Sequence, residues 1–193
     1  EPSSRWIDRP AGPVFGASGS SAIYRAEALR RVGAYDPAFG SYYEDVDLAF
    51  RLRWAGYSCI FAPECRVLHE ISATYDHGSP ALQRRMSRNA ELLFWTDLPL
   101  GRLRVAIIPH LAFTAAQLAW RGLKGRARPF LAGKRDAISA IPGFRRRRAE
   151  RVRLARSPVG RPHFPIGLVG FTDLRNHLRR PREASSIAPG GKR

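Results

Sequence analysis

Three carboxylates that could move a proton lie close together in the segment EDVDLAFRLRW: Glu44, Asp45 and Asp47. A correctly placed carboxylate acts as a general base when it takes the proton from a hydroxyl group whose oxygen attacks a second molecule. Two tyrosines and a glycine precede the cluster, at a loop-to-helix junction of the kind where functional residues concentrate. The cluster is therefore the first candidate for a catalytic site.

The same carboxylates also have a purely structural interpretation. Acidic side chains in the first turn of a helix are stabilised by the helix dipole, by about 0.3–1 kcal/mol each. Ser41 and Glu44 have the spacing of a capping box, and Asp47 lies four residues before Arg51, the favourable order for a surface ion pair. Composition alone favours this interpretation, because most carboxylates in proteins are not catalytic.

Two further segments bear on the choice between catalysis and structure. Small residues at positions 16–21 (GASGSS) follow an apolar run, and such a strand end lets a ligand approach the backbone. His69 follows an expected strand and could meet the carboxylates across an α/β layer. A single histidine without a partner at i+2 or i+4 is, however, more often structural.

Hydrophobic patterning predicts short strands alternating with helices in the first part of the chain, and helices thereafter. Strands are expected at residues 14–17, 58–62 and 65–68, and helices at residues 26–32, 41–56, 81–96, 130–141 and 145–156. An apolar segment at residues 103–120 is interrupted by Pro109. The predicted fold class is α/β, followed by an α-helical basic C-terminal region.

Charge is distributed unevenly along the 193 residues, whose net charge is +17. Residues 1–97 carry 11 basic and 12 acidic side chains, whereas residues 98–193 carry 22 basic and 4 acidic side chains. This asymmetry excludes a uniformly basic nucleic-acid binder. We expect a globular segment over residues 1–97, a helical and membrane-associating segment over residues 98–156, and a basic tail rich in Pro and Gly over residues 157–193.

The run from residue 16 to residue 57 resembles the second half of the catalytic domain of family 2 glycosyltransferases, and is most similar to bacterial members of the rhamnosyltransferase type. The matching features are a Gly-rich strand end, an Arg-x-x-Ala-Leu helix, a turn, a Glu-Asp helix and a Val-x-His strand, at residues 16–21, 25–29, 32–37, 43–57 and 67–69. The resemblance implies a GT-A fold, of which this chain holds the acceptor-binding half.

The donor-binding half, with the family's Asp-x-Asp metal and nucleotide motif, is not matched by any part of the chain. The chain opens at Glu1, and Met86 is its single methionine. We therefore expect that a further segment precedes it in the whole protein. We also expect this chain to be inactive by itself, because the donor-binding half is absent.

The resemblance also implies roles for individual residues. Asp45 corresponds to the catalytic base, which deprotonates an acceptor hydroxyl as its oxygen displaces the nucleotide and inverts the anomeric carbon. Tyr43, Glu44 and Asp47 are the neighbouring acceptor-binding positions, and His69 is a position that helps to hold the metal. The implied cofactor is a divalent metal, Mg or Mn, bound mainly by the missing N-terminal half. The implied substrates are a nucleotide-sugar donor of a hexosyl or rhamnosyl group and a glycan or lipid-linked acceptor.

The apolar segment at residues 103–120 has two interpretations. It is shorter than the roughly 20 apolar residues of a spanning helix and contains Arg104, so a helix lying in the membrane interface fits it, with Trp120 at the boundary. The basic run at residues 145–148 would add attraction to an anionic leaflet, by about 1 kcal/mol per residue. These features favour a cytoplasmic enzyme peripheral to the inner face of a bacterial plasma membrane. The alternative is a helical hairpin packed on the catalytic domain.

A different class of function is a non-catalytic basic module that binds membranes or nucleic acid. The run RRRRAERVRLAR at residues 145–156 could contact phosphates. No RNA-binding motif, zinc framework or helix-turn-helix spacing accompanies it in the sequence. Nucleic acid is therefore not an expected partner.

Overall fold

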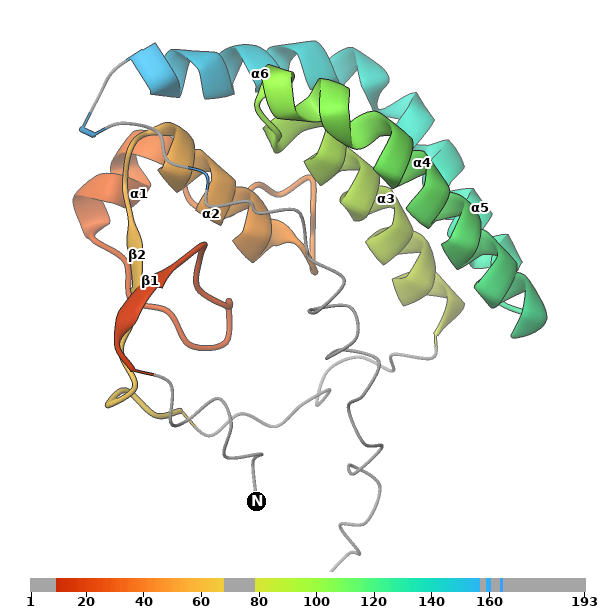
Figure 1. The fold of residues 1–193 in the computed structure, drawn as a ribbon, viewed down its shortest axis with the longest axis horizontal. Helices are drawn as coiled ribbons and strands as arrows, with labels where there is room; N and C mark the ends of the chain where they lie inside the picture. The colour runs from red at the N-terminus through yellow and green to blue at the C-terminus, as the bar shows by residue number, and fades with distance from the viewer. Residues whose placement is uncertain (1–9, 68–78, 157–158, 161–163, 165–193) are drawn as a thin grey trace, which may run out of the picture. The chain divides into compact units, whose positions relative to one another are not determined.

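The computed structural model describes residues 10–67, 79–156, 159–160 and 164. The chain divides into two compact units, Glu1–His163 and Phe164–Arg193, and every element named below lies in the first. In chain order these elements are β1 (Gly12–Val14), α1 (Ala26–Val32), α2 (Glu44–Trp54), β2 (Cys59–Phe61), α3 (Pro80–Asp97), α4 (Leu100–Leu123), α5 (Ala127–Ser139) and α6 (Ile141–Arg156) (Figure 1). The division that the sequence predicts at residues 97 and 156 stays a prediction.

The sheet in the described residues has two strands, β1 and β2, which pair antiparallel with Val14 opposite Cys59. The sequence predicts a larger α/β layer with a third strand at residues 65–68. Residues 65–67 have no strand structure, and residue 68 lies outside the described part of the chain. The described fold is thus mostly helical with a small sheet, since α3 to α6 follow one another without an intervening strand.

Helix α2 carries the candidate carboxylates, but it begins differently from the prediction. The residue that precedes the helix is Tyr43, which has a left-handed backbone (φ 73°) and provides no side-chain cap. The predicted capping box of Ser41 and Glu44 is therefore wrong. Ser41 lies outside the helix, because left-handed residues at 42 and 43 break the helical path between them. Glu44 still gains from the helix dipole, since it is the first residue of α2.

Helices α3 and α5 lie side by side and form the main helical contact (Figure 1). Gly133 of α5 allows their close approach, because a Cβ atom at this position would collide with the backbone carbonyl of Arg84. Ser79 caps α3 by accepting a hydrogen bond of 3.3 Å from the N–H of Leu82. Helix α6 packs on both α2 and α3, which ties the C-terminal helices to the candidate site.

Helix α4 is continuous through Pro109, where the sequence predicts an interruption. A proline removes one hydrogen-bond donor from a helix and does not always end it. Within α4 only Leu103 is buried, and large apolar side chains such as Val105 and Ile108 are 72% and 78% exposed. By length and composition α4 is the one helix of the described residues that could cross a membrane.

Candidate active site

Asp45 lies in the first turn of α2, and two backbone groups hold its side chain. Its Oδ2 atom accepts a hydrogen bond of 3.0 Å from the N–H of Gly19, and its Oδ1 atom accepts one of 2.8 Å from the N–H of Val46. The side chain is half-buried and forms no salt bridge with a described residue. The carboxylate is therefore oriented by backbone donors and is not neutralised by a guanidinium group.

Two tyrosines lie near the contact between Gly19 and Asp45. Burial, together with Tyr35 and the negative charge of Asp45, raises the pKa of Tyr24 to about 12. A Cβ atom at position 19 would lie 3.6 Å from Oη of Tyr35 and 3.7 Å from Cβ of Asp45. The backbone at Gly19 thus lies between a phenol and the candidate base, and the Tyr24 phenol keeps its proton at neutral pH.

The small residues before Gly19 have a packing role that the sequence did not reveal. The sequence predicts that the segment at residues 16–21 leaves room for a ligand. A Cβ atom at Gly16 would instead collide with the side chain of Ala49, in the middle of α2. Glycine at this position therefore lets the loop lie directly on the helix that carries Asp45.

Glu44 and Tyr43 lie beside Asp45 but differ in their surroundings. The Oε2 atom of Glu44 is buried and has no hydrogen-bond partner among the described residues. A buried acceptor without a partner costs about 1–3 kcal/mol, so this oxygen is suited to receive a hydroxyl group. Burial raises the pKa of the Tyr43 phenol, which therefore stays protonated. Contact of either residue with an acceptor stays a prediction.

Asp47 is fully buried, which corrects two expectations. Arg51 donates from Nε to its Oδ2 atom at 2.8 Å, and Arg151 donates from Nη2 to its Oδ1 atom at 2.6 Å. The predicted pair of Asp47 and Arg51 exists, but in the interior and not on the surface. An acceptor cannot reach a carboxylate that has no exposed surface and has both oxygens occupied. Asp47 therefore supports the fold and is not an acceptor-binding residue.

Asn89 of α3 holds the strained loop that leads into α2. Its Nδ2 atom lies 2.8 Å from the carbonyl oxygens of Phe39 and Tyr42 and 3.2 Å from that of Ser41. The loop contains two non-glycine residues in the left-handed region, Tyr42 at φ 68° and Tyr43 at φ 73°. Such a conformation costs roughly 1–2 kcal/mol per residue. The fully buried Asn89 side chain therefore stabilises the backbone that places the start of α2.

Some of the basic residues of α6 make contacts inside the protein. Arg147 forms an ion pair with Asp36, and Arg148 donates to the carbonyl oxygen of Trp95 at 2.7 Å. Burial alone would raise the pKa of Asp36, but the hydrogen bond from Arg147 brings it below its ordinary value. Two of the four arginines at residues 145–148 thus make internal contacts, which leaves Arg145 and Arg146 exposed for the expected attraction to an anionic surface.

A metal site is not formed by the described residues. Position 69, the expected metal-binding histidine, lies outside them, and the part of the chain that is described contains no group of three or more His, Cys, Asp or Glu that could hold a metal. Asp45 and Asp47 have the letters of an Asp-x-Asp motif, but Asp47 faces the interior. These residues do not fit a metal, so no chemical step below runs through one.

Nothing in the predicted motifs marks Asn89 or Arg151 as functionally relevant, although both help to position α2. The burial of Asn89 could have been predicted, because its helical spacing places it on the same face of the helix as Leu82 and Leu92, which are buried. The role of Arg151 could not have been predicted from sequence spacing, since its partners Asp47 and Asp97 lie 104 and 54 residues away.

The site is thus a carboxylate fixed by backbone donors at the start of a helix, as a proton-accepting group requires. Residues 3–132 match the family model described as Glycosyl transferase family group 2. The match covers more than half of the chain, and the chain belongs to this family of transferases. The predicted resemblance is confirmed. Membership implies a GT-A fold, of which the described residues show a mostly helical part with a small sheet.

Two curated relatives support the rhamnosyltransferase resemblance. They come from Mycobacterium tuberculosis, strains CDC 1551 / Oshkosh and ATCC 25618 / H37Rv, and both are named N-acetylglucosaminyl-diphospho-decaprenol L-rhamnosyltransferase. Each is 41% identical over 107 residues, which are 55% of this chain and 32% of the relative. The matched part thus spans about a third of the relatives' length. No solved structure matches the chain.

Proposed function

We propose that the chain is the acceptor-binding part of an inverting glycosyltransferase. The whole enzyme transfers a hexosyl or rhamnosyl group from a nucleotide-sugar to a hydroxyl group of a glycan or lipid-linked acceptor. The observation that carries this proposal is the placement of Asp45, whose carboxylate is held by the N–H of Gly19 and has no cationic partner among the described residues. Membership of the family supplies the reaction class.

In the proposed mechanism Asp45 takes the proton of the acceptor hydroxyl. The hydroxyl oxygen forms a bond to the anomeric carbon as the bond from that carbon to the nucleotide diphosphate breaks, and one such displacement inverts the carbon. A carboxylate is a weak base toward an alcohol, so its contribution comes from position and from proton transfer late in the reaction. The hydrogen bond from Gly19 supports this role because it fixes the direction of the carboxylate.

The acceptor side of the proposal involves Glu44 and Tyr43. The unpartnered Oε2 atom of Glu44 is an acceptor for a sugar hydroxyl, and the protonated phenol of Tyr43 is a donor. The relatives' name describes a sugar linked through a diphosphate to decaprenol. We extend this chemical class to the present chain as its proposed acceptor, a sugar on a polyisoprenoid diphosphate.

A lipid-linked acceptor requires an enzyme that works at a membrane surface. Helix α4 exposes large apolar side chains along its length, including Val105 and Ile108, and carries the exposed Arg104 near its start. Apolar contact with lipid and attraction of arginine to anionic headgroups act together in interfacial helices. We therefore place the enzyme at the cytoplasmic face of the membrane. A divalent metal, Mg or Mn, held mainly by a donor-binding half with help from His69, stays part of the proposal.

The test is the variant Asp45→Asn in the full-length protein. The amide has nearly the same shape, and its one carbonyl oxygen can still accept from Gly19 while the bond from Val46 is lost, so the fold should persist while the base is removed. We expect kcat to fall by about 10²–10⁴-fold, with binding of the nucleotide-sugar unchanged. The matched control is Glu64→Gln, which removes an exposed carboxylate of the same chain. Turnover of Asp45→Asn close to that of the control would show that Asp45 is not the base.

A further inference from the structure

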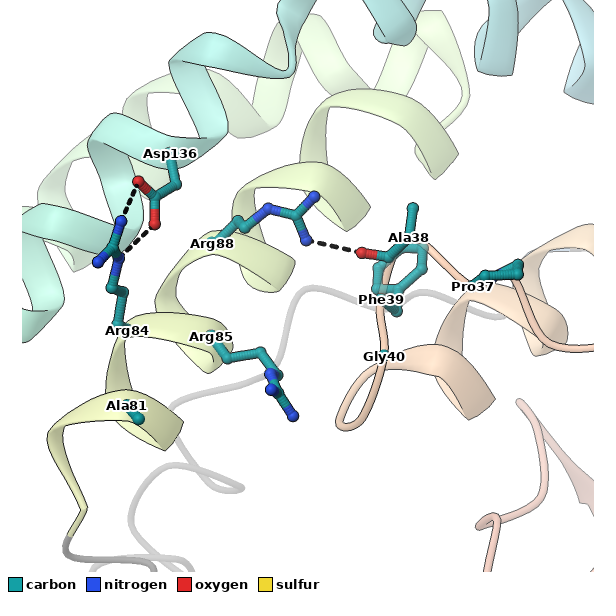
Figure 2. A pocket seen from close by; sticks show the side chains of 9 residues that line it. All are labelled: Pro37, Ala38, Phe39, Gly40, Ala81, Arg84, Arg85, Arg88 and Asp136. Carbon is teal, nitrogen blue, oxygen red and sulfur yellow. Dashed lines mark hydrogen bonds and ion pairs between the residues drawn. The ribbon is translucent and has the colours of Figure 1, made fainter.

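A pocket of about 320 Å³ lies between the loop before α2 and the N-terminal half of α3 (Figure 2). Three arginines of α3 and one carboxylate of α5 contribute to its lining: Arg84, Arg85, Arg88 and Asp136. The facing wall consists of residues 37–40. Asp45 does not line this pocket. The pocket is therefore separate from the proposed base, although its wall belongs to the loop that leads to it.

One of the three arginines is neutralised inside the pocket. Arg84 forms a two-fold contact with Asp136, from Nε to Oδ2 at 2.5 Å and from Nη2 to Oδ1 at 2.8 Å (Figure 2). The hydrogen bond from Arg84 lowers the pKa of Asp136 below its ordinary value, so this pair is ionised at neutral pH. The pair contributes no net charge to the pocket.

The other two arginines donate their described hydrogen bonds to neutral groups. Arg85 donates from Nη1 to Oγ of Ser41 at 2.6 Å. Arg88 donates from Nη1 to the carbonyl oxygen of Ala38 at 2.7 Å and to Oδ1 of Asn89 at 3.0 Å. Neither guanidinium group forms a salt bridge with a described residue. With three arginines and one carboxylate in its lining, the pocket carries a net charge of +2, although the charge of Asp136 also acts on Arg88.

These two guanidinium groups have the capacity to bind an anion. Arg85 and Arg88 are three residues apart on α3, so they lie on the same face of the helix. Each guanidinium group has five N–H donors, and most of these are not used in the contacts above. Gly40 lies beside Arg85: a Cβ atom at this position would lie 4.0 Å from its Cζ atom. Gly40 therefore adds no side chain next to Arg85, whereas the hydroxyl group of Ser41 already accepts a hydrogen bond from it.

We propose that Arg85 and Arg88 bind the diphosphate group of the acceptor, a sugar on a polyisoprenoid diphosphate. This inference rests on the proposed function. Two fork-shaped cations match a diphosphate better than a single carboxylate, because each can make two parallel hydrogen bonds to phosphate oxygens. Ser41, which contacts Arg85, stands four residues before Asp45, so their Cα atoms are at most about 15 Å apart. In this proposal the sugar attached to the bound diphosphate extends from the pocket toward the base.

The nucleotide-sugar donor also contains a diphosphate group, so it is the other ligand that these arginines could bind. A donor must bind where its anomeric carbon faces the attacking hydroxyl, and the resemblance places its nucleotide in the other half of the domain. The arginines of this pocket come from the acceptor-binding half. We therefore assign the pocket to the acceptor, and the experiment separates the two sources.

The first measurement is local and does not depend on turnover. Full-length protein is treated with an arginine-modifying reagent such as phenylglyoxal, with and without inorganic pyrophosphate, and modification of each arginine is followed by mass spectrometry. We expect pyrophosphate to slow the modification of Arg85 several-fold and to leave that of Arg30 unchanged. Arg30 is a matched control because it is exposed on α1, far along the chain from the pocket residues. Equal rates at Arg85 with and without pyrophosphate would overturn the proposal.

The second measurement identifies the source of the diphosphate. The exposed side chain of Arg85 makes Arg85→Gln compatible with folding, and Arg30→Gln is the control with the same change of charge. We expect Arg85→Gln to raise KM for the diphosphate-linked acceptor by about tenfold to a hundredfold, with KM for the nucleotide-sugar unchanged. A rise in KM for the nucleotide-sugar alone would overturn the assignment to the acceptor. The outcome is independent of Asp45→Asn, which tests the base and not the pocket.

Discussion

Arg151 donates a hydrogen bond of 2.6 Å to Asp47, although 104 residues separate them in the chain. The same guanidinium group donates from Nε to Asp97 at 2.7 Å. Both carboxylates are fully buried, and Arg151 itself is 2% exposed. A basic residue of the last helix thus balances two buried acids, one of them in the helix that carries the proposed base. Helix α6 therefore contributes to the packing of the helix that carries the candidate site.

Replacing Arg151 should strongly destabilise the protein. In Arg151→Met two buried carboxylates lose a shared cation, and removal of one partner of a buried ion pair costs about 3–5 kcal/mol. We expect the free energy of unfolding in urea to fall by this amount. Arg153→Met on the same helix is the control, because its side chain is exposed. Equal stability of the two variants would contradict the role assigned to the buried network.

Loss of the Asn89 amide should loosen the loop before α2. Asn89→Ala removes the donors to the carbonyl groups of the loop and should cost about 1–3 kcal/mol. We expect faster hydrogen exchange of the amides at residues 39–45, measured by mass spectrometry. Thr96→Val is the matched control. Thr96 is a buried polar residue of the same helix, and the hydrogen bond described for its side chain goes to the carbonyl oxygen of Leu92 and not to the loop. Faster exchange in both variants would indicate a general loss of stability.

The Glu91 cluster should make stability depend on pH in the acid range. Burial alone would raise the pKa of Glu91, but hydrogen bonds from His110 and Lys134 lower it to about 2 from an ordinary value of 4.5. A lowered pKa in the folded state means that the stabilisation is fully present above pH 4.5 and is lost as pH falls toward 2.

The variant Glu91→Gln isolates this contribution. We expect it to lower the free energy of unfolding at pH 7, and we expect the difference from the unmodified protein to shrink steadily between pH 4.5 and pH 2. Glu27→Gln, which changes an exposed carboxylate of α1, should show no such difference. A difference in the free energy of unfolding that stays constant with pH would mean that Glu91 acts through packing and not through its charge.

The exposed apolar face of α4 should bind anionic membranes. Ile108→Asp and Phe113→Asp place charges on side chains that are 78% and 58% exposed, so the fold should persist. We expect each variant to reduce co-sedimentation with liposomes that contain anionic lipid by about tenfold or more, because burial of such a side chain contributes about 1.5–3 kcal/mol. Ile138→Asp on α5, where the isoleucine is 64% exposed, is the control. Unchanged liposome binding together with tight binding to duplex DNA would support the basic-module alternative.

Local patterns in the sequence determined several elements closely. The short helix expected at residues 26–32, ended by a glycine, and the polar helix expected at residues 81–96 correspond to α1 and α3, and the basic segment at residues 145–156 lies within α6. The motif around Asp45 also identified the family, because its residue types follow one another at fixed spacing along one stretch of chain. Such features depend on near neighbours, and near neighbours are visible in a sequence.

Tertiary structure alone decided which charges are used for the fold. The four-residue spacing predicts the pair of Asp47 and Arg51, which the structure contains. The spacing does not predict that Arg151 also binds Asp47, or that the pair is buried away from water. Likewise Ser41 has the spacing of a helix cap, yet its hydroxyl contacts Arg85, because left-handed residues turn the chain before α2 begins. The energy of a buried charge depends on every group packed around it, and those groups come from helices that only folding brings together.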